Sequence, residues 1–300
     1  MTDRLIVAIG CKPLAVGGGR LLAKTELAKG QRPARDTNCE RESDNKPKTT
    51  PNLNTRTSTP QHTAHQHIMP GIFTISLDFE LHWGGFEKWP LGDPKDGDTY
   101  NQYFLNTREV IPKMLELFEE HEVHVTWATV GMLFHESKEE SRANWPKEKP
   151  GYEVEKLSAY NYIETSGIGE NEEQDPFHYA PTLIRKIADT PHQEIGTHTF
   201  AHYYCNEPGQ TVEQFREDLK AAQRAAAKYG KKLRSLVFPR NQFNDQYLKV
   251  CYQEGITSVR SNPLDWFWHI ESTQKEGAWK RLNRGLDPYF PVGTKNTYAM

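Results

Sequence analysis

Residues 194–202 read Glu-Ile-Gly-Thr-His-Thr-Phe-Ala-His and place two histidines, His198 and His202, four positions apart after a short apolar segment. On one helical turn, side chains four residues apart lie on the same face, so the two imidazoles are expected to converge. Converging imidazoles are typical of zinc sites in proteins. Histidine pairs also occur for structural reasons, so other motifs of the chain are needed to distinguish a metal site from a structural pair.

Strand-like and helix-like segments alternate on both sides of this stretch. The expected strands cover residues 72–79, 123–130, 194–196, 233–238 and 256–259. The expected helices cover residues 109–120, 181–188, 211–229 and 245–254, and a polar excursion covers residues 136–176. This alternation predicts an α/β fold with a parallel sheet or a (β/α) barrel, in which chemical groups gather at the carboxyl ends of the strands.

Composition divides the chain into two parts. The 300 residues include 13 Phe, 13 Tyr and 7 Trp, and the first of these aromatic residues is Phe73. Residues 1–67 hold 11 Lys and Arg against 6 Asp and Glu, so they carry +5 and the remainder carries −8 of the total of −3. We therefore predict a disordered or poorly ordered extension over residues 1–68 and a folded domain over residues 69–300, with Met69 as an alternative natural start.

The same figures exclude several classes of protein. The four cysteines form no Cys-x-x-Cys pair, which does not fit a disulfide scaffold or a zinc knuckle. The net charge gives no overall affinity for nucleic acid, and no apolar run approaches the ~20 residues of a membrane span. No clear secretory signal is present, so we expect a cytoplasmic location.

A pair of carboxylates marks the end of the first expected strand, within Ser-Leu-Asp-Phe-Glu-Leu-His-Trp-Gly at residues 76–84. Alternation along a strand puts Asp78 and Glu80 on one face. Two carboxylates aimed at one place at a strand end suit a metal ligand and a general base. Together with the histidine pair, they predict a hydrolytic metal site with an open position for water.

Two further segments offer charged and aromatic side chains. Arg240 follows the apolar strand of residues 233–238, and a cation placed there keeps a neighbouring carboxylate ionised. Asp265 begins a segment that contains Trp266 and Trp268. The flat faces of these two indoles, and of Trp83 in the first motif, are candidate surfaces on which sugar rings stack.

The order of these motifs over residues 70–290 resembles that of the polysaccharide deacetylase family, carbohydrate esterase family 4. Gly-Thr-His-Thr-Phe-Ala-His is the most specific element, and the segment at residues 76–84 looks like a variant first motif. Residues 125–131 resemble the second strand of the family. The resemblance implies a distorted (β/α) barrel with fewer than eight complete units, a divalent metal, usually zinc, and hydrolysis of acetyl groups from glycans.

The resemblance also implies roles for individual residues. It makes Asp78 the catalytic base, Arg240 the arginine that holds this base, and His198 and His202 the metal ligands, and it places Asp265 and Trp266 in the groove wall. Phe79 stands where the commoner family pattern has a metal-binding aspartate. Glu80 is therefore expected as the third ligand, and the roles of Asp78 and Glu80 could be exchanged.

The last family motif, whose histidine protonates the leaving group, is absent, because no histidine follows His269. Either the C-terminal strand is missing, or His269 or His82 supplies the acid, or the chain is inactive. The sequence thus predicts a zinc-dependent hydrolase that deacetylates a glycan or polysaccharide. Two alternatives stay open: hydrolysis of a non-sugar C–N bond, and a degenerate domain that binds glycans without catalysis.

Overall fold

The computed structural model describes residues 6–9, 24–25, 74–92, 99–263, 265–272, 277–290 and 292–294. Its contacts divide the chain into one unit of residues 1–26 and 72–299 and another of residues 27–71 and 300, so all described residues belong to the first unit. Within the predicted extension, the structure describes two strands, β1 (Ile6–Ile9) and β2 (Lys24–Thr25). The rest of that extension and Met69 lie outside the described residues.

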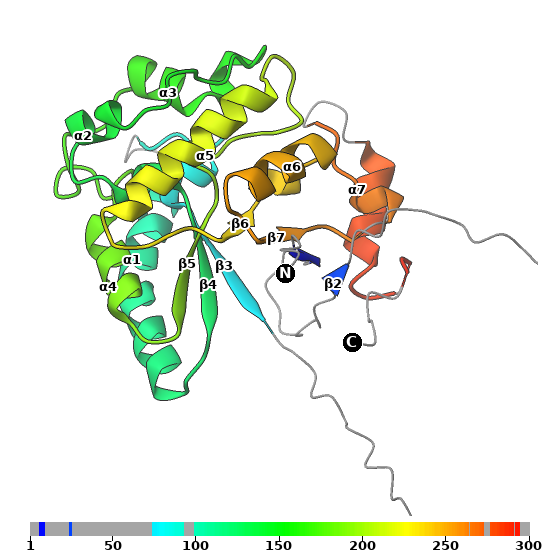
Figure 1. The fold of residues 1–300 in the computed structure, drawn as a ribbon, viewed down its shortest axis with the longest axis horizontal. Helices are drawn as coiled ribbons and strands as arrows, with labels where there is room; N and C mark the ends of the chain where they lie inside the picture. The colour runs from blue at the N-terminus through cyan, green and yellow to red at the C-terminus, as the bar shows by residue number, and fades with distance from the viewer. Residues whose placement is uncertain are drawn as a thin grey trace, which may run out of the picture. The chain divides into compact units, whose positions relative to one another are not determined.

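The described strands form one sheet in the order β2-β1-β7-β6-β5-β4-β3 (Figure 1). Five consecutive strands of this order run parallel: β3 (Ile75–Phe79), β4 (Val125–Thr129), β5 (Gln193–Thr197), β6 (Ser235–Val237) and β7 (Ser258–Ser261). β1 extends the sheet parallel to β7, and β2 pairs with β1 in the antiparallel sense. The predicted α/β fold is confirmed, as a curled half-barrel of five parallel strands with helices.

Helices alternate with these strands. They are α1 (Thr99–Glu120), α2 (Lys138–Ala143), α3 (Ala159–Thr165), α4 (Pro181–Asp189), α5 (Val212–Ala227), α6 (Asp245–Gln253) and α7 (Ala278–Leu286). Short 3-10 turns are η1 (Leu81–Gly84), η3 (Gly131–Phe134), η4 (Glu155–Leu157), η5 (Pro239–Asn241) and η6 (Trp266–Trp268). α1 begins ten residues before the predicted start, and α7 was not predicted.

Local sequence explains several of these boundaries. Thr211 caps α5 through a reciprocal pair of hydrogen bonds with Gln214. This capping box gives an acceptor to two backbone N–H groups that would otherwise be unpaired. Pro181 opens α4, where its missing N–H costs nothing. α1 was predicted too short because residues 99–108 are mostly polar and carry little apolar periodicity.

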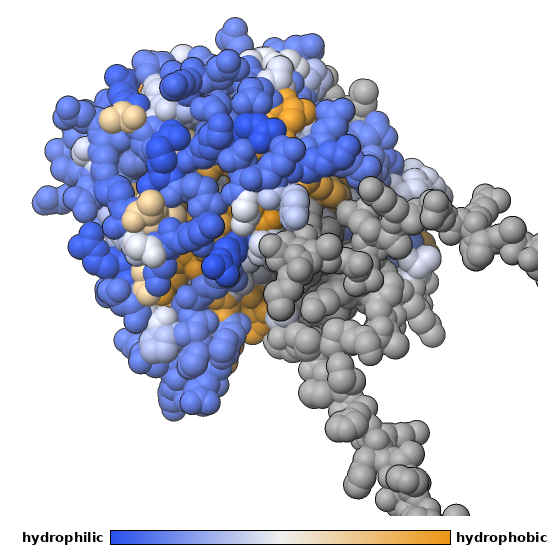
Figure 2. Space-filling model, in the orientation of Figure 1, coloured by the Kyte–Doolittle hydropathy of each residue, from blue (hydrophilic) through white to orange (hydrophobic). Residues whose placement is uncertain are grey.

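One face of the sheet packs against helices and forms the core. α1 and α4 lie side by side next to β3, β4 and β5 (Figure 1). Phe79 meets Trp127 edge to face there, with ring centroids 6.4 Å apart. The face drawn in Figure 2 is mainly hydrophilic with small hydrophobic areas. None of the described helices combines the length and hydrophobicity that a membrane crossing requires.

The other face of the sheet is polar and lies inside the curl. Arg260 of β7 donates to both carboxylate oxygens of Asp78 in β3, at 2.6 and 2.8 Å, and to the Ser76 hydroxyl at 2.8 Å. Three strands separate β3 from β7 in the sheet order, so this contact requires the sheet to curl toward this face. On the same face, Glu194 of β5 accepts hydrogen bonds from Thr126 and Ser235 on the neighbouring strands.

α5 holds the loop after β5, which carries His198 and His202. The buried carboxylate of Asp218 accepts hydrogen bonds from the backbone N–H groups of Phe200, at 2.6 Å, and Ala201, at 3.1 Å. Burial raises the pKa of Asp218 to about 7, although the two backbone donors lower it. A buried charge at this position is retained because it satisfies two loop N–H groups at once.

We expect Asp218→Ala to destabilise the protein by about 3 kcal/mol at pH 8, above the pKa of this carboxyl, because two buried N–H groups lose their acceptor. The measurement is the free energy of unfolding in urea. Glu217→Ala is the matched control: Glu217 pairs with Lys220 at 2.9 Å near the surface, and its loss should cost less than about 1 kcal/mol. Equal effects of the two substitutions would contradict this assignment.

A second buried titratable group lies beside η3. His135 is 1% exposed, with Nδ1 3.2 Å from the Met132 carbonyl and Nε2 3.1 Å from Nδ2 of Asn144. The carbonyl requires a donor and the amide supplies one, so the imidazole is neutral. Burial, assisted by the charge of Lys228, lowers the pKa of His135 to about 4, although the Met132 carbonyl raises it.

Because the folded-state pKa of His135 lies below its unfolded value of about 6.5, its contribution to stability is lost as the pH falls from about 6.5 toward 4. Linkage predicts a loss of about 2 kcal/mol between pH 8 and pH 5 from this residue. The free energy of unfolding in urea, measured at both pH values, should not show this loss in His135→Gln. The control His121→Gln, at an exposed position, should show it as the wild type does. An unchanged pH dependence in His135→Gln would disprove the prediction.

Candidate metal centre

The parallel register brings the ends of three strands into one row. Phe79 pairs with Thr129, and Thr129 pairs with Thr197. The row continues beyond the strands, because the N–H of His198 donates to the Thr129 carbonyl at 2.9 Å. Glu80, the residue after Phe79, and His198, the residue after Thr197, therefore leave the sheet at the same edge.

Glu80 meets both histidines at this edge. Its Oε2 lies 3.2 Å from Nε2 of His198 and 3.0 Å from Nε2 of His202. Both imidazoles are buried, and one ligand atom from each of the three residues lies within 4.8 Å of the others. Burial alone raises the pKa of Glu80, but hydrogen bonds to the two histidines and their charge bring it well below its usual value. The predicted trio of Glu80, His198 and His202 is thus brought together.

A small residue makes room for the Glu80 carboxylate. A Cβ placed on Gly84 would lie 2.6 Å from Oε1 and 2.7 Å from Oε2 of Glu80. Those distances are shorter than contacts between real atoms, so any side chain at position 84 would displace the carboxylate. Two imidazoles and one carboxylate, with this space kept clear around them, fit a zinc-type metal by the chemistry of their donor atoms.

The histidine pair does not lie on a helix, contrary to the prediction. β5 ends at Thr197, and the following loop contains two residues with left-handed backbone, Thr199 (φ 65°) and His202 (φ 53°). The Thr199 hydroxyl holds this turn by accepting from the N–H of Tyr203 at 2.6 Å. Convergence of the two rings therefore depends on a strained loop, and strain of this kind persists only where the surroundings enforce it.

The partner of Asp78 also differs from the prediction. Arg260 pairs with Asp78, while Arg240 pairs with Glu87 and lies 4.0 Å from the buried carboxylate of Glu207. Arg240 has a left-handed backbone in η5 (φ 53°). Burial lowers the pKa of Arg240 to about 10, although the charge of Glu80 raises it, so its guanidinium remains charged at neutral pH.

Sequence reasoning missed two residues beside the candidate metal ligands, Glu87 and Tyr204. The Tyr204 hydroxyl lies 2.9 Å from Nδ1 of His202 and 3.5 Å from Oε2 of Glu87. Burial first, and then the charges of Glu80 and Glu207, raise the pKa of Tyr204 well above its usual value, so the hydroxyl keeps its proton. The Tyr-Tyr-Cys segment directly after His202 was the available signal, but nothing in its spacing indicated contact with a ligand.

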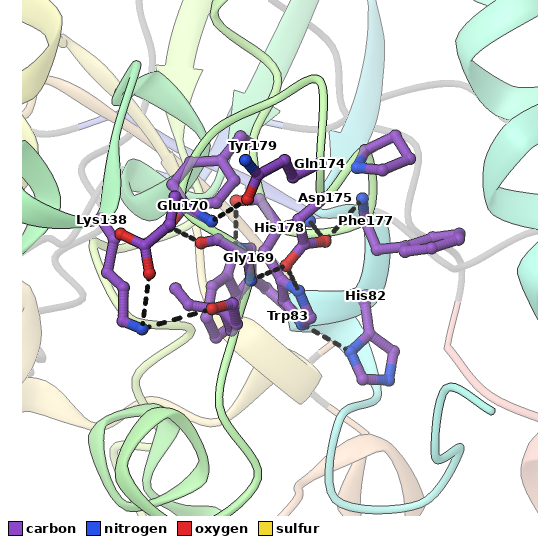
Figure 3. Close-up of polar contacts among 12 residues, drawn as sticks. His82, Trp83, Lys138, Gly169, Glu170, Gln174, Asp175, Phe177, His178 and Tyr179 are labelled. Atoms are coloured by element: carbon purple, nitrogen blue, oxygen red, sulfur yellow. Dashed lines mark hydrogen bonds and ion pairs between the residues drawn. The ribbon is translucent and has the colours of Figure 1, made fainter.

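His82, one of the two substitutes considered for the missing acid, is committed elsewhere (Figure 3). Its Nδ1 lies 2.9 Å from Nε2 of His178, whose Nδ1 lies 2.8 Å from Asp175, and its Nε2 lies 2.6 Å from the Trp89 carbonyl. His82 is fully buried, and burial lowers its pKa to about 4. With both ring nitrogens engaged, His82 anchors the segment after Glu80 and offers no proton to a substrate.

The tryptophans divide between core and surface. Trp83 is 1% exposed and donates to the His178 carbonyl at 3.0 Å, so the prediction that it binds substrate is wrong. Trp266 is 56% exposed, whereas the indole of Trp268 donates to Asp287 at 3.1 Å. Asp265 accepts from the N–H and hydroxyl of Thr294, at 3.0 and 3.1 Å, and thereby holds a C-terminal turn.

Three solved structures illustrate the similarity to known proteins. A mutant of BA3943, a CE4 family pseudoenzyme from Bacillus anthracis, with restored enzymatic activity, is 15% identical, with 62% of this chain and 43% of that chain covered (TM-score 0.34). A family 4 carbohydrate esterase from Bacillus anthracis is 16% identical, with 72% and 75% covered (TM-score 0.34). The BpsB deacetylase domain from Bordetella bronchiseptica is 13% identical, with 51% and 65% covered (TM-score 0.32).

The chain spans less than half the length of the BA3943 structures that it matches. The comparison with curated proteins found no match. The family model described as polysaccharide deacetylase matches residues 96–259, a range that contains both histidines, Arg240 and strands β4 to β6. With more than half of its length matched by this model, the chain belongs to the polysaccharide deacetylase family.

Proposed function

We propose that the protein is a metal-dependent hydrolase that removes acetyl groups from an N-acetylated glycan. The observation that carries this proposal is the meeting of Glu80, His198 and His202 at the carboxyl edge of the sheet in a polysaccharide deacetylase chain. Two imidazole nitrogens and one carboxylate leave coordination positions open, as in hydrolytic metal sites. A divalent cation held there would act as a Lewis acid that lowers the pKa of water and polarises a carbonyl.

Asp78 is the carboxylate to which we assign removal of the proton from the attacking water. It precedes Glu80 by two residues and lies on the inner face of the curl. Arg260 takes the positioning role that the family resemblance gives to Arg240, because it fixes both oxygens of Asp78. Each oxygen retains a further lone pair that can accept a proton.

Trp266 supports a glycan as the substrate class, because its exposed indole can stack on a sugar ring. One observation favours a second candidate function, a domain that binds glycans without catalysis. His82 cannot serve as the leaving-group acid, since both of its ring nitrogens are engaged in the core. Acetate release from N-acetylated oligosaccharides, with and without added zinc, separates the two functions: no release by a zinc-loaded protein that still binds the oligosaccharide supports the second.

Removal of any one ligand should abolish tight metal uptake. We expect His198→Ala, His202→Ala and Glu80→Gln each to weaken Zn²⁺ binding by more than about 100-fold, because outer hydrogen-bond partners alone contribute ~10–100-fold. Competition with a chromophoric chelator measures the affinity, and Glu164→Gln, at an exposed ion pair with Arg142, is the control. A wild-type protein that takes up no zinc, cobalt or nickel would overturn the proposed function.

Substitution of Asp78 should leave metal binding intact and lower the catalytic rate. We expect Asp78→Asn to keep zinc affinity within about threefold, because Asp78 lies outside the group of ligand atoms, and to lower kcat by about 100-fold or more through loss of the base. Zinc titration and acetate release on the same preparation measure both quantities. If Asp78→Asn loses the metal while Glu80→Gln retains it, the roles of the two carboxylates are exchanged.

A further inference from the structure

The two histidines of the metal centre differ in what lies behind them. Nδ1 of His202 contacts the Tyr204 hydroxyl at 2.9 Å. Nδ1 of His198 is buried and has no hydrogen-bond partner among the described residues. The ring orientation of His202 is therefore set by a polar contact that His198 lacks.

Tyr204 is itself held on several sides. It is fully buried, its backbone N–H donates to the Tyr152 hydroxyl at 2.8 Å, and the guanidinium of Arg240 lies over its ring, 4.2 Å from the centroid. Glu87, whose side chain is 2% exposed, pairs with the same Arg240 and approaches the Tyr204 hydroxyl with its second oxygen. Arg240 thus holds Tyr204 and Glu87 together, so the hydroxyl has little freedom to turn elsewhere.

Hydrogen-bond roles in this group follow from the chemistry of its members. A metal ion on Nε2 of His202 would leave the proton of the neutral imidazole on Nδ1, 2.9 Å from the Tyr204 hydroxyl. The carboxylate of Glu87 only accepts, so the single O–H of Tyr204 would then point to Glu87. The hydroxyl oxygen would accept from Nδ1–H of His202. In this tautomer Nε2 carries the lone pair that a metal ion would take, and Oε2 of Glu80 lies 3.0 Å from it. Two acceptors at this distance need a cation or a proton between them.

We propose that Tyr204, backed by Glu87 and Arg240, is a positioning residue for the metal centre that selects the Nδ1–H tautomer of His202. This inference rests on the proposed function, since it concerns the same site. Metal-binding histidines commonly donate their second nitrogen to a carboxylate or carbonyl, which orients the ring and raises its basicity. In this protein, a buried tyrosine relays that contact from Glu87.

The test compares two neighbouring tyrosines, each of which loses only its hydroxyl. Tyr204→Phe should lower Zn²⁺ affinity ~10–100-fold and alter the visible absorption spectrum of the Co²⁺-loaded protein. Tyr203→Phe is the matched control: Tyr203 is equally buried, but its hydroxyl contacts Gln210 at 2.8 Å and the Thr211 carbonyl at 2.9 Å. The control should change neither the affinity nor the spectrum.

A second variant keeps the inference testable if Tyr204→Phe does not fold. Glu87→Gln should also weaken Zn²⁺ binding, and combining it with Tyr204→Phe should cost less than the two single effects together, because both act through one contact. Wild-type zinc affinity in Tyr204→Phe and in Glu87→Gln would overturn the inference and leave the proposed function standing. Absence of zinc uptake by the wild-type protein would overturn both.

Discussion

Parallel pairing of β3, β4 and β5 in one register is the constraint on which the rest of the structure depends. Because Phe79, Thr129 and Thr197 share a row, Glu80 and the histidine loop emerge at the same edge of the sheet. A shift of one residue in either pairing would turn the following side chain to the opposite face. Backbone hydrogen bonding between the strands therefore positions the candidate metal centre.

Three polar groups support this edge, and each contacts more than one neighbour: Asp218 is fully buried, and Arg240 and Arg260 are half-buried. Asp218 holds the histidine loop, Arg260 joins the two ends of the curled segment, and Arg240 lies between Glu87 and Tyr204. Such groups cost free energy to desolvate, and they are retained where they impose one geometry on their surroundings. Here that geometry includes left-handed backbone at Thr199, His202 and Arg240, all beside the candidate metal centre.

Local pattern was sufficient for most of the fold. Apolar periodicity predicted the five parallel strands and four of the helices, because each face that packs on the core repeats at the interval of its own element. It failed where local preference is weak or overridden: the polar first half of α1, the short helices within residues 136–176, and the histidine loop, which two left-handed residues turn without a helix. The grouping of Glu80, His198 and His202 was predicted because each of them follows the end of an expected strand.

By itself, the sequence determined the α/β class and the positions of Glu80, His198 and His202, since alternation and strand-end placement are local properties. Only the tertiary structure decided which arginine meets Asp78, that Trp83 and His82 belong to the core, and that Glu87 reaches the contact behind His202. Arg260 and Asp78 are separated by 182 positions and Arg240 and Glu87 by 153. Contacts between residues so far apart in the sequence depend on the curl of the sheet, which no local pattern encodes.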